Sequence, residues 1–177
     1  TPAAPIVRIA WNDPVIVKRV LDLGASGIMV PYVQTAEEAT EAVRAMRYPP
    51  QGVRGVSSLN RATEFGARFA DYYERSNREL LTVVPIETGA AVEAADGIAA
   101  VEGVDVLFVG PQDLSTSLGI QNHYDHPDFK GALEAVVAAT ERHGKAAGIL
   151  VLNEAMLEPM VELGMRFIAF GSDGGIV

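Results

Sequence analysis

The chain has 177 residues, of which 49% are hydrophobic; this is enough for one packed core, so we predict a single domain over residues 1–177. Its net charge of −9 and its 14 dispersed Lys and Arg residues exclude the basic face that binding to nucleic acid or to an anionic membrane requires. The sequence has no cysteine and no apolar run of about 18 residues, so it offers neither a disulfide framework nor a candidate membrane span, and we expect a cytoplasmic protein.

Short apolar runs without polar alternation recur along the chain. Such runs are typical of parallel strands that are buried on both faces. Several helical stretches between them end in a glycine, which closes the last helical turn without steric cost. The pattern predicts strands at Ile6–Ile9, Gly27–Val30, Leu80–Ile86, Val104–Val109, Ala147–Val151 and Phe167–Phe170.

Capping residues indicate where the intervening helices begin. Asp13-Pro14 and His126-Pro127 place proline at a first helical position, and Thr35 to Glu38 match a capping box. Asn153 predicts a further helix start, with a kink or restart at Pro159 because proline disrupts a helix interior. Residues 48–77 form the irregular part of the chain; it opens with an ordered excursion, and its later part, Phe69–Arg78, is predicted as a helix that leads to the next strand.

Strands that alternate with helices predict an α/β fold with a parallel sheet. Six βα units are fewer than a closed eight-stranded barrel, which usually takes about 250 residues. We therefore predict a partial TIM (β/α)8 barrel that holds about six of the eight units and lacks the N-terminal units and the C-terminal helix.

Two acidic motifs, Pro85-Ile86-Glu87 and Gly110-Pro111-Gln112-Asp113, each follow a predicted strand. The carboxyl ends of parallel strands meet at one edge, where α/β enzymes place their chemistry. Two carboxylates at adjacent strand ends are hard oxygen ligands suited to Mg²⁺ or Mn²⁺. The alternative is a helix N-cap for Asp113 and a surface acid for Glu87.

An ordered series of motifs carries a family resemblance. The series resembles the HpcH/HpaI family of metal-dependent (class II) pyruvate aldolases, which cleave 2-keto-4-hydroxy acids, and it extends from Val7 to Asp173. The motifs are Val7-Arg8, Trp11-Asn12-Asp13, Asp22-Leu23-Gly24-Ala25, Val30-Pro31-Tyr32-Val33, Arg47 to Gly55, Ile86-Glu87, Val101 to Asp105 and Gly110 to Ser115.

The resemblance implies roles for particular residues. Glu87 and Asp113 match the ligands of a divalent cation (Mg²⁺, Mn²⁺ or Co²⁺), and the backbone amides of Gln112 and Asp113 match those that hold the pyruvate carboxylate. Arg8 matches a catalytic arginine that stabilises the enolate. Asp22 matches an acid that raises the basicity of a catalytic histidine. For Arg54 and Asp173, contact with substrate at the rim of the site and a purely structural role both stay open.

Two departures from the family pattern concern the site. Pro85 replaces a substrate-contacting glutamine of several relatives, and the family's base histidine would lie upstream of Thr1. We predict that His123 is a loop residue, His126 a helix cap and His143 a cation at a helix end. We expect the segment expressed alone to be poorly soluble and inactive.

These observations predict an aldolase that converts a 2-keto-4-hydroxy acid to pyruvate and an aldehyde, reversibly. The resemblance also implies a homo-oligomer, a hexamer with its active site near a subunit interface. The alternatives are an enzyme similar to citryl- or malyl-CoA lyase or to macrophomate synthase, or a catalytically silent barrel that serves as a binding module.

Overall fold

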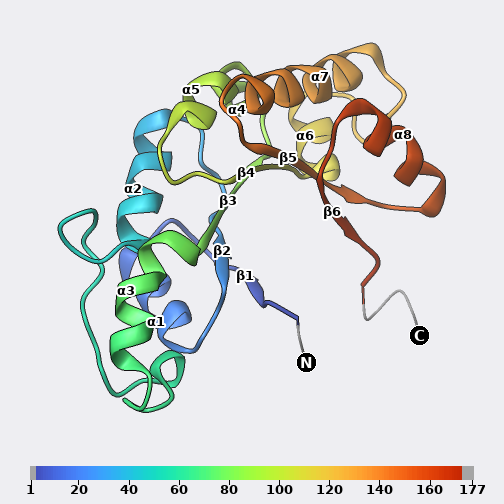
Figure 1. The fold of residues 1–177 in the computed structure, drawn as a ribbon. Coiled ribbons are helices and arrows are strands. Elements are labelled where there is room, and N and C mark those ends of the chain that lie inside the picture. The colour runs from blue at the N-terminus through green and yellow to red at the C-terminus, as the bar shows by residue number, and fades with distance from the viewer. Residues whose placement is uncertain (1–2, 173–177) are drawn as a thin grey trace.

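A computed structural model describes residues 3–172. One sheet of parallel strands runs in the order β1-β2-β3-β4-β5-β6, so that each strand pairs with the next along the chain. The sheet curls, its helices lie along the outer side, and its two edge strands, β1 and β6, lie at the open side (Figure 1). This curled half-barrel confirms the predicted α/β fold of a partial TIM barrel.

The strands lie within two residues of their predicted limits. β4 begins two residues later than expected, and just before its start the side chain of Asp105 accepts the backbone amide of Thr82 at 2.8 Å. The strands are β1 Ile6–Arg8, β2 Gly27–Met29, β3 Leu81–Ile86, β4 Val106–Val109, β5 Ala146–Val151 and β6 Phe167–Phe170.

The helices follow the strands as the alternation predicts. None of the helices within residues 3–172 is long and apolar enough to cross a bilayer. They are α1 Pro14–Asp22, α2 Ala36–Met46, α3 Phe69–Glu79, α4 Gly89–Glu93, α5 Ala95–Ala100, α6 Pro111–Ser117, α7 Pro127–Arg142 and α8 Leu157–Leu163, with the 3-10 turns η1 Arg61–Thr63 and η2 Glu154–Met156.

The predicted helix starts are confirmed, but one capping side chain has a different hydrogen-bond partner from the one expected. Asp13 caps α1 by accepting the first-turn amides of that helix. Thr35 accepts the amide of Glu38 at 3.2 Å, but the Glu38 carboxylate reaches back to the amide of Gln34, not to that of Thr35. Asn153 caps the short turn η2, and the chain restarts as α8 with Pro159 in its first turn, where a missing N–H costs no hydrogen bond.

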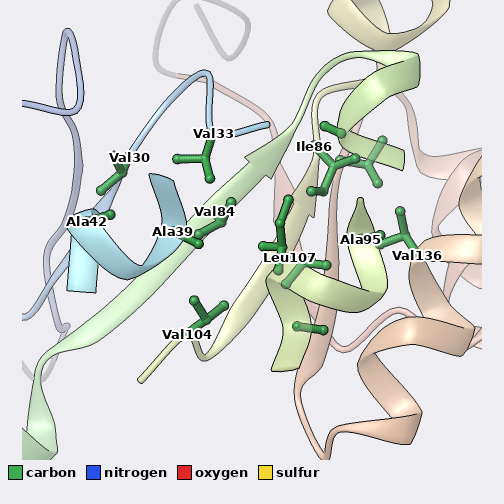
Figure 2. Close-up of a cluster of buried hydrophobic side chains, with 14 of the residues drawn as sticks. Val30, Val33, Ala39, Ala42, Val84, Ile86, Ala95, Val104, Leu107 and Val136 are labelled. Carbon is green, nitrogen blue, oxygen red and sulfur yellow. The ribbon is translucent and has the colours of Figure 1, made fainter. Parts of the chain in front are cut away.

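The two faces of the sheet are both apolar. Val84, Ile86 and Leu107 point toward the helices and pack in a main core that also contains Ala95 and Val136 (Figure 2). The intervening strand residues form a second cluster that contains strand residues only, so it lies on the face away from the helices; its buried members are Val83, Val106 and Phe108. Burial on both faces is what the unalternating strand sequences predict.

Candidate active site

Glu87 and Asp113 lie at the same edge of the sheet. Glu87 follows the last residue of β3, and Asp113 lies in the first turn of α6, which follows β4. The two strands are parallel neighbours, with Ile86 opposite Val109. A Cβ atom on Gly110 would lie 3.6 Å from Asp113 Oδ2 and 3.7 Å from Glu87 Oε1, so these oxygens are no further apart than the sum of the two distances.

The Glu87 carboxylate is oriented by groups from two other strand ends. Its Oε1 accepts a hydrogen bond from Arg8 Nη2 at 3.0 Å, and its Oε2 accepts the backbone amide of Tyr32 at 3.3 Å. The Glu87 side chain is 11% exposed, whereas that of Arg8 is 58% exposed. The Nη2 group of Arg8 therefore orients the Glu87 carboxylate, while the rest of the Arg8 side chain faces the open site.

Asp113 is exposed, and within residues 3–172 its carboxylate has no hydrogen bond or ion pair. Gly110 is the N-cap of α6, with no side-chain capping bond, so the alternative in which Asp113 caps this helix is wrong. The first-turn amides of Gln112 and Asp113 have no acceptor in this part of the chain. An unpaired carboxylate and two free N–H donors thus lie on one turn.

A cavity of about 430 Å³ opens over these groups. Loops after β1, β2, β3 and β4 form its walls, so four strand ends contribute to one site. The cavity is lined chiefly by Arg8, Trp11, Tyr32, Glu87, Asp113 and Ser117. Pro85 is buried within β3 and offers no donor here.

The residues present fit a divalent cation with few protein ligands. No group of three or more His, Cys, Asp or Glu in residues 3–172 could hold a metal, so a cation at this edge would have the two carboxylates as its side-chain ligands. Mg²⁺ is commonly bound in this way, with water and substrate oxygens completing its shell. The unpaired Asp113 and the space beside Gly110 are consistent with that chemistry.

Asp22 lies at the opposite end of the sheet in this chain. It is the last residue of α1, from which the chain turns into the amino end of β2. Its Oδ1 accepts from Arg54 Nη2 at 2.8 Å, and its Oδ2 accepts from Lys18 Nζ. Asp22 is therefore not brought together with Glu87 within one chain.

Arg54 is fully buried and pairs with Asp22, so of the two roles left open for it the structure favours the structural one. Its guanidinium lies 4.6 Å from the ring centre of Tyr48 and donates to the Tyr72 hydroxyl at 3.1 Å. Burial raises the pKa of the Tyr48 hydroxyl, which keeps that ring neutral beside the arginine. Asp173 lies outside the described residues.

The three histidines lie where the sequence predicts and none lines the cavity. His126 caps α7, with Nδ1 accepting the amide of Asp128 at 3.2 Å. His143 follows the end of α7, with Nε2 3.0 Å from Asp96 Oδ1. His123 lies in the loop before α7.

Sequence reasoning gave no role to Trp11 and Tyr32, although both occur in motifs of the resemblance. Their rings stack with centres 5.7 Å apart, beside the two carboxylates. Tyr32 has a positive φ of 57°. An aromatic residue directly after Pro31, just beyond the end of β2, was the available signal, but a positive φ at tyrosine cannot be predicted from composition or periodicity.

Comparisons with known proteins agree on one family. The family model described as HpcH/HpaI aldolase/citrate lyase matches residues 1–177. A 5-keto-4-deoxy-D-glucarate aldolase of Shigella boydii is 45% identical over 174 residues, which cover 98% of this chain and 67% of the relative. The chain thus spans about two thirds of that relative's length.

Solved structures give the same result. A HpcH/HpaI aldolase/citrate lyase family protein from Burkholderia cenocepacia J2315 superposes with a TM-score of 0.94 at 39% identity, covering 99% of this chain and 69% of that one. Macrophomate synthase gives a TM-score of 0.81 at 30% identity, covering 98% of this chain and 62% of that one.

Proposed function

The chain belongs to the HpcH/HpaI aldolase/citrate lyase family, and we propose that it is the part of a metal-dependent aldolase that holds pyruvate while a 2-keto-4-hydroxy acid is cleaved. The assignment to a carbon–carbon lyase, an aldolase, follows from relatives of that name at 45% identity over nearly the whole chain. The observation that carries the finer proposal is the convergence of Glu87 and Asp113 beside Gly110.

Glu87 and Asp113 would hold the divalent cation on which this family generally depends. When bound, a cation of this kind acts as a Lewis acid that polarises the keto oxygen of the substrate. The choice among Mg²⁺, Mn²⁺ and Co²⁺ is left to experiment, since carboxylate ligands suit all three. Glu87 is held by Arg8 and Tyr32 before any ligand arrives, which reduces the cost of ordering it.

The free amides of Gln112 and Asp113 would bind the carboxylate of the pyruvate half. Their role needs only main-chain N–H groups at the start of α6, so the side chain of Gln112 is not required. Binding here would put the keto group near Asp113 and Arg8, which line the same cavity.

Arg8 would stabilise the charge that develops during cleavage. The C4 hydroxyl loses its proton to a base, the C3–C4 bond breaks, and its electron pair passes to C3 as the C4 carbonyl forms. The resulting enolate takes a proton at C3 and becomes pyruvate. The positive charge of the Arg8 guanidinium would stabilise the negative charge on the enolate oxygen. That negative charge develops only along the reaction path, so the interaction would be stronger in the transition state than in the bound substrate.

Asp22 can assist this reaction only from another copy of the chain, because its own carboxylate lies at the far end of the sheet from Glu87. This arrangement suits the homo-oligomer that the resemblance implies. The hexameric state, the cytoplasmic location, the base upstream of Thr1 and the single domain over residues 1–177 stay predictions.

Of the alternatives, a CoA-dependent lyase is disfavoured by charge. Arg8 is the only basic residue among those that line the described cavity, whereas CoA phosphates need several. A reaction similar to that of macrophomate synthase remains the second candidate, since that enzyme has the same fold at 30% identity.

The test is pyruvate release from a 2-keto-4-hydroxy acid by the full-length protein, with and without a chelator. We expect release that stops with the chelator and resumes on adding Mg²⁺ or Mn²⁺. A silent binding module would bind the keto acid without cleaving it. Loss of CO2 from a β-keto diacid, without cleavage of the 2-keto-4-hydroxy acid, would support the macrophomate synthase alternative.

A further inference from the structure

A pair of stacked aromatic rings forms one wall of the cavity next to the candidate metal ligands. The ring centres of Trp11 and Tyr32 lie 5.7 Å apart with 25° between the planes. Trp11 is 57% exposed and Tyr32 is 50% exposed, so much of each ring surface contacts no protein atom in the described chain. Both residues line the same cavity as Glu87 and Asp113.

The chain fixes this aromatic wall in place. Tyr32 has a φ of 57°, a left-handed conformation that is uncommon and costs energy for a bulky residue. That conformation accompanies the 3.3 Å hydrogen bond from its amide to Glu87 Oε2. The carbonyl of Trp11 accepts the amide of Asp13, the cap of α1, at 2.9 Å.

These anchors set the distance between the aromatic wall and the reacting atoms. The Tyr32 amide is hydrogen-bonded to the Glu87 carboxylate, so the Tyr32 ring is attached to backbone that lies next to this carboxylate. If the pyruvate half binds at Asp113 and Arg8 as proposed, the cavity lining left for the remaining carbons of a longer keto acid includes the loops after β1 and β2, which carry the two rings.

We propose that Trp11 and Tyr32 bind the carbon chain of the aldehyde half of the substrate and select for its length. This proposal rests on the proposed aldolase function. Aromatic faces stack on C–H surfaces and exclude water from them. An apolar surface rejects an added hydroxyl poorly, so the wall would distinguish a three-carbon aldehyde from a two-carbon one better than it distinguishes hydroxyl patterns.

The test uses the full-length protein with Mg²⁺ and pyruvate, in the direction of aldol addition. The kcat/KM is measured for glycolaldehyde, which has two carbons, and for glyceraldehyde, which has three; both are uncharged hydroxyaldehydes. We expect Trp11→Ala and Tyr32→Ala to lower the value for glyceraldehyde about tenfold more than the value for glycolaldehyde. Trp11→Phe keeps an aromatic face and should recover most of the loss.

Phe65→Ala is the matched control, because Phe65 is also exposed and also has a positive φ, of 54°, but lies outside the cavity. It should leave the ratio of the two aldehydes unchanged. An equal fall for both aldehydes, or no fall, would overturn the proposal and return the rings to a structural role. Exchange of the methyl protons of pyruvate with deuterium in the unaltered protein tests the proposed function separately, since it needs no aldehyde.

Discussion

At the residue scale, the proposed function depends on how the carboxylates of Glu87 and Asp113 are positioned beside Gly110. Gly110 separates Glu87 from Asp113, and a methyl group there would come within 3.3 Å of Glu87 Cγ, closer than most real contacts. Its φ of −89° is open to any residue, so its importance is space and not backbone conformation.

Gly110→Ala should therefore weaken cation binding without unfolding the protein. The added methyl group displaces the Glu87 side chain from the shared oxygens, and we expect Mn²⁺ affinity to fall by about tenfold. Isothermal titration measures the affinity and circular dichroism checks the fold. Full Mn²⁺ affinity in this variant would show that the two carboxylates do not share an ion.

Arg8 gives a kinetic prediction. Since the enolate charge appears only along the reaction path, Arg8→Ala should lower kcat by roughly 10²–10³-fold and change the KM for substrate much less. Arg19→Ala, an exposed arginine in the last turn of α1, is the control. A kcat that survives the loss of Arg8 would assign this residue to the surface.

At the element scale, the most unusual contact joins α1 to the irregular segment before α3. Arg54 has a side chain with 0% exposure and pairs with Asp22 at the end of α1. The two residues are 32 positions apart and the chain around Arg54 is irregular, so no local pattern indicates this pair and the sequence left the role of Arg54 open. The strands, caps and histidines were predictable because each depends on a local pattern.

Breaking this buried pair should destabilise the protein. Arg54→Met leaves the partly buried Asp22 with Lys18 alone, and removing one partner of a buried pair costs about 3 kcal/mol. Urea unfolding of the full-length protein would measure the change. A loss below about 1 kcal/mol would mean that the Arg54 guanidinium, with its ion pair to Asp22 and its contacts with the Tyr48 and Tyr72 rings, contributes little to holding this segment.

A substitution in helix α7 should stabilise the protein. Gly131 lies inside this helix, is exposed, and has no atom within 4 Å of the position where a Cβ would be added. Gly131→Ala should raise the free energy of unfolding by about 0.5–1 kcal/mol, because alanine loses less backbone entropy in a helix. A decrease in the midpoint of thermal unfolding would contradict this packing.

At the scale of the whole molecule, the sheet decides which residues can act together. Glu87 and Asp113 were predictable partners because parallel order alone brings the ends of β3 and β4 to one edge. Asp22 follows a helix and thus lies at the other edge, a consequence of topology that motif matching does not reveal. The role of Tyr32 was hidden because a backbone amide carries no sequence signature.

This geometry predicts complementation between copies. Asp22→Asn and Glu87→Gln proteins, each inactive alone, should regain part of the aldolase activity when they are unfolded and refolded together, since some mixed sites would have both native residues. Refolding either variant by itself is the control. Mixtures that stay inactive would argue against an Asp22 contribution from a second copy.

The central claim is that Glu87 and Asp113 together hold one divalent cation, and electron paramagnetic resonance of Mn²⁺ tests it most directly. We predict that the full-length protein removes one equivalent of free Mn²⁺ signal per chain and that pyruvate tightens this binding. Glu87→Gln and Asp113→Asn should each weaken it by at least about tenfold. Glu93→Gln, an exposed acid on α4 outside the cavity, should bind like the unaltered protein. Unchanged Mn²⁺ binding after loss of either Glu87 or Asp113 would contradict the account.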